Sequence, residues 1–202
     1  MYQKLEESAA IEKNFAEKQQ ASTKAAQNEK ALYNEIISLE IDQKQQIKED
    51  MKDAQQLNEK QKHYLQEAKD SFNKANKVSS QIKTAVQDID DTKEKKKATA
   101  VVQLMEKRQN VFESYYHQYL DVLKLNNHLY EQLQSKALKA SNLDKQIKKI
   151  NQNYKTMKEQ EQEFNHITKQ YNQVKSQYYN KSSLTQKRIN QMEEDRDKDV
   201  LA

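Results

Sequence analysis

Apolar residues recur every three or four positions through most of the chain, the spacing that places them on one face of an α-helix. The pattern is most regular in the last third, where Glu161 takes one of the apolar positions. The three clearest stripes are Tyr64, Ala68, Phe72, Ala75, Val78, Ile82, Val86 and Ile89; Val101, Leu104, Val111, Tyr115, Tyr119, Val122, Leu125, Leu129 and Leu133; and Leu143, Ile147, Ile150, Tyr154, Met157, Phe164, Ile167, Tyr171, Val174 and Tyr178. We therefore expect three long helices, each burying a narrow apolar face.

The N-terminal region carries a weaker version of the same pattern. Its apolar positions are Leu5, Phe15, Leu32, Ile36, Leu39, Ile47 and Met51. Between them, residues 21–31 are rich in alanine, which suits close helix packing but carries little periodicity. We expect a fourth helical segment here.

Composition restricts the fold further. The 202 residues include no glycine and no proline, the residues that most often form tight turns. An α/β or all-β domain of this length needs many turns, so both classes are excluded. Hydrophobic residues make up 35% and charged residues 33%, which fits narrow stripes on long helices better than a compact globular core. Basic and acidic residues nearly balance, 35 against 31, and together with the periodicity this argues against disorder.

Helix boundaries must be read from capping residues. Ser141 with Asp144 three positions later forms the best capping pattern, and Asp91 with Glu94 the second best. A third reversal is expected near Asp50–Asp53, where an aspartate could cap a new helix.

Breaks near 51, 92 and 141 divide the chain into four segments of similar length, each about 60 to 75 Å long as a helix. We predict an all-α fold, an elongated antiparallel up-and-down bundle that forms a single domain over residues 1–202. Ser182 and Ser183 would precede a charged tail at 193–202. A three-helix bundle and an extended coiled-coil dimer remain alternatives.

The two halves of the chain differ in charge. Residues 1–92 hold 14 basic and 17 acidic residues, whereas residues 101–192 hold 15 basic and 8 acidic ones. The basic surplus gathers around the predicted turn at Ser141, and a smaller group (Lys93, Lys95, Lys96 and Lys97) lies at the preceding turn. The candidate polyanion-binding residues are Lys136, Lys139, Lys145, Lys148, Lys149, Lys155 and Lys158. Nucleic acid, anionic lipid and wall teichoic acid would each suit such a surface chemically, but the chain has only three arginines, which disfavours specific nucleic-acid binding.

No pattern of catalytic residues emerges. Without glycine there is no phosphate-binding loop, and without cysteine there is no thiolate ligand or nucleophile. Glu163 and His166 match the Glu-x-x-His pattern of di-iron bundles, but the pattern occurs once only. The other histidines are His63, His117 and His128, and none belongs to a convincing ligand pair such as HExxH. The predicted turns would bring His63 near His128 and His117 near His166, so a metal-dependent enzyme is a third alternative. We expect no catalytic, cofactor or metal site, and hence no enzyme.

Eleven tyrosines could serve the core or the surface. Tyr115, Tyr119, Tyr154, Tyr171 and Tyr178 follow the stripes, so we expect buried rings whose hydroxyls reach solvent. The two tyrosines that fall outside the stripes, and are the candidate surface aromatics for stacking on sugars, are Tyr116 and Tyr179.

The composition, the four helical segments and stretches such as Phe112-Glu113-Ser114-Tyr115-Tyr116 resemble the YkyA-type cell-wall-binding lipoproteins of low-GC Gram-positive bacteria. The resemblance covers nearly the whole chain but assigns no functional residue. It implies a leader that ends in a lipid-modified cysteine; the absence of cysteine and of an apolar start fits a mature chain whose leader has been removed.

The resulting hypothesis is a non-catalytic envelope module, outside the cytoplasmic membrane and anchored by lipid, that contacts anionic wall polymer or an envelope protein. The alternative is a cytoplasmic coiled-coil scaffold, or a BAR-like dimer that shapes membranes. No run of about 18 apolar residues occurs, so we expect membrane association only through the lipid anchor.

Overall fold

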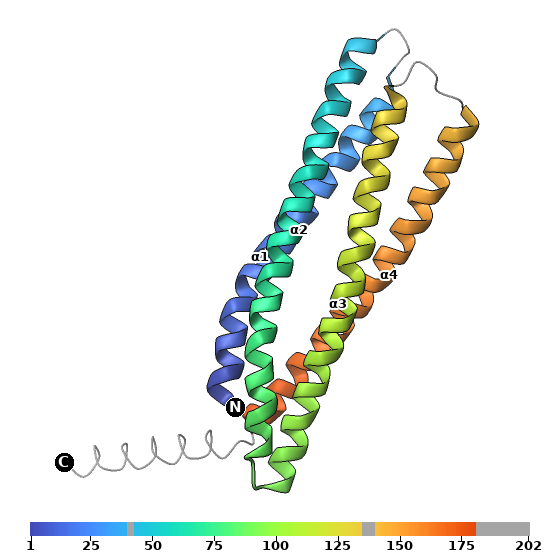
Figure 1. The fold of residues 1–202 in the computed structure, drawn as a ribbon. Helices are drawn as coiled ribbons and strands as arrows, with labels where there is room; N and C mark the ends of the chain where they lie inside the picture. Colours follow the sequence, from blue (N-terminus) through green and yellow to red (C-terminus); the bar gives the residue numbers. More distant parts are fainter. Residues whose placement is uncertain (40–42, 135–139, 181–202) are drawn as a thin grey trace, which may run out of the picture.

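The structure, a computed structural model, describes residues 1–39, 43–134 and 140–180. These residues form four helices and no strand: α1 (Tyr2–Ile36), α2 (Lys44–Gln87), α3 (Thr92–Leu133) and α4 (Ala140–Tyr179). They pack as an elongated up-and-down bundle, which confirms the predicted all-α class (Figure 1). The proposed tail at 193–202 lies outside the described residues.

The bundle consists of two helical hairpins side by side. Helix α1 pairs closely with α2, α3 pairs closely with α4, and the two hairpins meet mainly through α2 and α3. Figure 1 places Met1, the α2–α3 turn and the end of α4 together at one end of the bundle, called here the near end. The end of α1 and the beginning of α4 lie at the opposite, far end.

The first reversal was predicted in the wrong place. Helix α1 ends at Ile36, and Asp50–Asp53 lie inside α2. Asp50 stays helical because its Oδ1 accepts a hydrogen bond from Gln46 Nε2 at 2.6 Å, while the next residue, Met51, is buried. Burial of Met51 and Ala54 therefore outweighs the weak helix propensity of aspartate.

Of the caps predicted at the other two reversals, one agrees with the structure and one does not. Asp91 is the N-cap of α3, as predicted: its backbone is extended and its Oδ1 accepts a hydrogen bond from the Glu94 amide at 2.7 Å. Ser141, by contrast, lies within α4, one residue after Ala140, so its prediction as the N-cap is wrong. Whatever precedes α4 falls at residues 135–139, which lie outside the described part of the chain.

The core contains a layer built from all four phenylalanines of the protein, one from each helix. Their ring centroids lie 4.6 to 5.9 Å apart, within the range in which aromatic pairs attract. The four residues are Phe15, Phe72, Phe112 and Phe164. This layer fixes the register of the helices against one another near the middle of the bundle.

Two further apolar clusters lie on either side of this layer. The near-end cluster includes Leu5, Ile82, Val101 and Tyr171 and so draws on every helix. The far-end cluster, formed by Ile36, Met51, Ala54 and Tyr130, includes buried residues of α1, α2 and α3 only. Among the described residues, α4 therefore contributes buried residues to the near-end cluster but none to the far-end cluster.

The weak apolar signal of α1 has a structural explanation. Buried positions in this helix recur every seven residues, but several are polar. The series is Ser8, Phe15, Ser22, Glu29 and Ile36. The buried positions of α1 are therefore regularly spaced, but both apolar and polar residues occupy them.

Candidate functional site

The lysines that were predicted around the α3–α4 turn lie on the outer side of α4. All five within the described residues are exposed: Lys145, Lys148, Lys149, Lys155 and Lys158. They are referred to below as the lysine face. The opposite side of this half of α4 is held on α3 by buried Ile150 and by Gln146, whose Nε2 donates to the Leu125 carbonyl oxygen at 2.9 Å. Lys136 and Lys139 fall outside the described residues.

Among the described residues, the lysines of the lysine face form no local ion pairs. Residues 140–158 hold five lysines and one acidic residue, Asp144, and the next acidic residues of α4 are Glu159, Glu161 and Glu163. Within the described parts of the chain, none of the five ammonium groups forms an ion pair within 4.0 Å. These charges are therefore available to an anionic partner.

The second lysine group has a different setting. Lys93, Lys95, Lys96 and Lys97 at the near end share their turn with Asp88, Asp90, Asp91 and Glu94, so the local charge balances. Lys95 Nζ also donates to the Gln87 carbonyl oxygen at 2.9 Å, which helps to close the turn. This group therefore has no charge surplus comparable with that of the lysine face.

Tyr116 is not at the surface, which corrects its prediction as a surface aromatic. Its side chain is buried in the apolar cluster that contains the four phenylalanines. Its hydroxyl donates to Gln66 Oε1, and Lys69 Nζ lies 4.2 Å from its ring centroid. Burial raises the pKa of the phenol. Because α3 contacts both α2 and α4, its buried face is wider than a single stripe, and Tyr116 falls within it.

Tyr179 is partly exposed at the near end. Its ring packs on Tyr2 with a centroid distance of 4.7 Å, and its hydroxyl donates to Glu6 Oε1 at 2.5 Å. These contacts tie the end of α4 to the beginning of α1. A role of Tyr179 in sugar stacking stays a prediction.

The stripe tyrosines do not all send their hydroxyls to solvent, as had been expected. The Tyr119 hydroxyl donates to Gln61 Oε1 at 2.9 Å and accepts from Ser22 Oγ at 3.2 Å, and both contacts are buried. The Tyr171 hydroxyl is buried without a hydrogen-bond partner among the described residues. Burial is the main cause that raises the pKa of Tyr154 to about 12.

A buried acid, Glu29 of α1, forms the centre of a polar layer that sequence reasoning missed. Gln61 Nε2, the Tyr130 hydroxyl and Asn126 Nδ2 donate to its carboxylate at 2.7, 2.9 and 3.1 Å. Asn126 Nδ2 also donates to the Tyr154 hydroxyl of α4 at 2.9 Å. Burial raises the pKa of Glu29, and the three hydrogen bonds oppose that rise in part. The layer links all four helices without a cationic side chain.

A buried cation, Arg108 of α3, was also not predicted from the sequence. Its side chain is 3% exposed and forms a two-pronged ion pair with Glu12 of α1 at 2.9 and 3.1 Å. Its Nε donates to Thr168 Oγ1 of α4 at 3.0 Å. The guanidinium carbon lies 4.9 to 5.5 Å from the ring centroids of Phe72, Phe164 and Tyr171. Arg108 thus joins α1 and α4, which otherwise contact each other sparsely.

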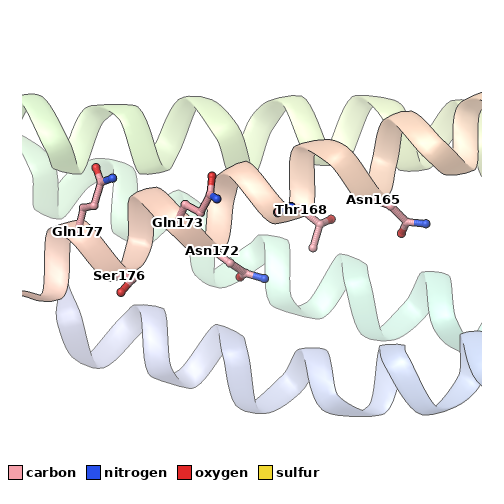
Figure 2. Close-up of a pocket in the computed structure, with 7 residues that line it drawn as sticks. Asn165, Thr168, Asn172, Gln173, Ser176 and Gln177 are labelled. Carbon is pink, nitrogen blue, oxygen red and sulfur yellow. The ribbon is translucent and has the colours of Figure 1, made fainter.

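The outer side of α4 in its C-terminal half is an open polar surface that this helix forms alone. Figure 2 shows Asn165, Thr168, Asn172 and Ser176 pointing away from α3, and Gln173 and Gln177 pointing toward it. Lys169 completes this set of residues. Four amides and two hydroxyls therefore lie on this surface, with one cation and no carboxylate.

The histidines do not converge. His63, His117 and His128 each lie 3.6 to 3.9 Å from an acidic residue of their own helix, namely Glu67, Glu113 and Glu131. His166 is exposed on α4. Over residues 1–39, 43–134 and 140–180, no three His, Asp or Glu side chains gather in a geometry suited to a metal ion.

None of the helices described is long and apolar enough to cross a membrane. No solved structure matches the chain.

Sequence comparison identifies relatives of this protein. The family model named YkyA, described as "Putative cell-wall binding lipoprotein", matches residues 1–181. The "Uncharacterized lipoprotein YkyA" of Bacillus subtilis (strain 168) is 31% identical over 179 residues, which cover 89% of this chain and 80% of that protein. The chain therefore belongs to the YkyA family, as the resemblance had indicated.

Proposed function

We propose that this chain is a non-catalytic module of the cell envelope that binds anionic wall polymer through the lysine face of α4. The observation that carries the proposal is the set of five exposed lysines, none of which has an ion-pair partner within the described residues. Such a surface attracts a polymer with regularly spaced negative charges more strongly than it attracts a single small anion, because several contacts form at once.

The position of the lysine face in the bundle supports the same function. The face belongs to the half of α4 that begins at the far end, whereas Met1 lies at the near end (Figure 1). In a lipoprotein the lipid is attached on the N-terminal side, so the bundle would hold the lysine face away from the membrane. A helix of 44 residues such as α2 is about 66 Å long, which sets the scale of that separation.

The lysine face can be tested by reversing one charge. Lys148→Glu should leave the melting temperature unchanged, because the side chain is exposed, and should weaken retention on purified cell walls several-fold. Retention of the unaltered protein should fall as salt is raised, because screening weakens contacts between exposed charges. Retention is measured by co-sedimentation with the walls.

Lys96→Glu is the matched control, since Lys96 is exposed but lies in the charge-balanced turn at the near end. It should bind walls as well as the unaltered protein does. If Lys148→Glu binds walls as strongly as Lys96→Glu at low salt, the lysine face is not the binding surface.

A further inference from the structure

The contact between the first hairpin (α1 and α2) and the second hairpin (α3 and α4), called here the seam, changes in chemistry along the bundle. In the near half it is apolar: Leu5 and Ile82 form one cluster with Val101 and other residues of the second hairpin. At the far end, among the described residues, the second hairpin contributes one buried side chain to the apolar cluster, Tyr130. Hydrogen bonds between buried or half-buried side chains cross the far half of the seam instead, and they join Ser22 and Gln61 to Tyr119, Asn58 to Asn127, and Glu29 to Asn126 and Tyr130.

The connectivity of the bundle allows the two ends of the seam to behave differently. Each hairpin is packed more closely within itself than against the other, since the two meet mainly through α2 and α3. They are joined by the α2–α3 turn at the near end, where Asp91 caps α3 and Lys95 bonds to the Gln87 carbonyl oxygen (Figure 1). The far half of the seam can therefore separate while this turn and the apolar near half hold the hairpins together.

Glu29 is the central group of the far half of the seam. Its side chain is 2% exposed, and its carboxylate has three donors, two amides and a phenol, all of them neutral. In the near half, by contrast, the Glu12 carboxylate is paired with Arg108. A protonated Glu29 leaves the layer neutral, and the Tyr130 hydroxyl can accept its proton because a hydroxyl both donates and accepts. An ionised Glu29 is a buried charge without a counterion among the described residues, which is costly.

The other groups around Glu29 do not offset its charge. The titratable ones are Tyr33 on α1, Tyr119 and Tyr130 on α3, and Tyr154 and Glu161 on α4. Helix α2 contributes the neutral amide of Gln61. Burial raises the pKa of Tyr119, Tyr130 and Tyr154, so these phenols stay neutral well above pH 7. Glu161 is partly exposed, so water stabilises its charge. Glu29 is therefore the acid of this layer whose ionisation its surroundings oppose.

We infer that the seam is a pH-controlled hinge, in which the far halves of the two hairpins part when Glu29 loses its proton while the near halves stay together. Parting gives water access to the carboxylate. The N-terminal half of α4 does not obstruct this access, because among the described residues it contributes no buried side chain to the far-end cluster. The opening would carry the lysine face away from the first hairpin, and it would occur whether or not that face binds wall polymer.

The direction of the pH dependence follows from proton linkage. The open state exposes Glu29 to water and gives it the ordinary glutamate pKa of 4.5, whereas burial raises this pKa in the closed state. The closed state therefore binds the proton more tightly and is fully favoured below pH 4.5. Above this pH, the ratio of open to closed molecules should rise by up to about tenfold per pH unit, until the closed-state pKa is passed.

Spin labels can follow the two ends of the seam separately. The chain has no cysteine, so labels attach only at introduced ones. The far pair is Asn28→Cys with Gln152→Cys, and the near pair is Gln3→Cys with Gln177→Cys. All four residues are exposed and uncharged, and both pairs join α1 to α4. Double electron–electron resonance gives the distribution of distances between the two labels at pH 4.5 and pH 7.5.

The far pair is also placed in Glu29→Gln and in a matched control, Glu17→Gln, an exposed glutamate of the same helix. Circular dichroism melting confirms that each variant is folded. In the unaltered background and in Glu17→Gln, the far-pair distribution should be narrow at pH 4.5 and gain a longer-distance component at pH 7.5. The near pair should not change. Glu29→Gln should keep the narrow far-pair distribution at both pH values, because an amide does not ionise.

Three outcomes would overturn the inference. A far-pair distribution that is the same at both pH values would show that the seam does not open. Lengthening of the near pair together with the far pair would mean loss of the whole bundle and no hinge. The same pH response in Glu29→Gln as in Glu17→Gln would show that another group controls the opening. If Glu29→Gln does not fold, the far and near pairs in the unaltered background still decide whether the hinge exists.

Discussion

The two halves of α4 have similar apolar stripes in the sequence, but the stripe residues are buried to different extents in the structure. In the C-terminal half, Phe164, Ile167, Tyr171 and Tyr178 are all at most 3% exposed. Of these, Phe164, Tyr171 and Tyr178 belong to apolar clusters to which every helix contributes. In the N-terminal half, Ile150 is the buried apolar residue, and the apolar positions on either side of it are partly exposed. Regular spacing thus establishes that a helix has an apolar face without establishing how many neighbours that face has.

In the N-terminal half of α4, polar contacts with α3 compensate for the smaller number of buried apolar residues. Gln146 and Asn153 bond to residues of α3, and the Tyr154 hydroxyl accepts from Asn126, also on α3. In the C-terminal half, Arg108 and Phe164 connect α4 with α1 and α2 as well. We infer that the near end of α4 is the stable part of this helix and that its far end can change surface charge with little effect on folding.

The largest effect is expected from removing the buried cation near Thr168. Arg108→Ala should lower the free energy of unfolding by about 3 kcal/mol or more, because it leaves the largely buried Glu12 carboxylate unpaired and removes contacts with three aromatic rings. Chemical denaturation monitored by circular dichroism provides the measurement. A double-mutant cycle with Glu12→Gln should show strong coupling, and additive losses would show that the ion pair does not hold α1 to α4.

The next largest effect is expected from alanine substitutions that compare the packing of the two halves of α4. Ile167→Ala, at a site with 0% exposure, should cost about 4 kcal/mol. Ile150→Ala, at a site with 7% exposure in the half of α4 whose other stripe residues are partly exposed, should cost about 2 kcal/mol. Ile150→Asp should still lower the melting temperature sharply, because it places an unpaired charge against α3. Equal costs for the two alanine variants would mean that both halves of α4 are packed alike.

The smallest effect depends on pH and concerns the polar layer that reaches Tyr154. Burial raises the pKa of Glu29 in the folded state above the ordinary glutamate value of 4.5, so the fold favours the protonated acid. The resulting stabilisation is complete below pH 4.5 and is lost as pH rises through the folded-state pKa. Glu29→Gln keeps the shape of the protonated side chain, so its stability relative to the unaltered protein should rise with pH above 4.5.

Denaturation midpoints of both proteins between about pH 4.5 and 7.5 check this prediction, since that interval lies above the ordinary glutamate pKa. Glu59→Gln, an exposed site on α2, is the control and should follow the unaltered protein. Parallel curves for Glu29→Gln and the unaltered protein would show that Glu29 has the same protonation behaviour when folded and unfolded.

The helical class could be predicted from sequence because apolar spacing reports local geometry, and the absence of glycine and proline leaves few places to turn. The Asp91 cap was also predictable, since its bond to Glu94 spans three residues. The α1–α2 reversal was not, because Ile36 and Ile37 continue the helical composition and the decisive factor is burial of Met51 by another helix.

The buried charges were unpredictable for a related reason. Glu29 and Arg108 take positions in the buried heptads of their helices, but each looks like an ordinary surface residue until its partners on other helices are known. The seven-residue spacing of Ser22, Glu29 and Ile36 was the available signal. The exposed lysines of α4 were predictable as a cluster, because solvated charge needs no distant partner. Their binding role stays a prediction.

The location of Met1 and the lysine face toward opposite ends of the bundle has a mechanical consequence (Figure 1). If the chain were held at Met1 and pulled at the first turns of α4, the force would act along the helix axes. The helices would then separate only by sliding past one another. Such shear strains many side-chain contacts at once, whereas a sideways pull would peel them apart one after another. Arg108 bonds to both α1 and α4, the two helices on which this force acts, and would therefore resist that sliding.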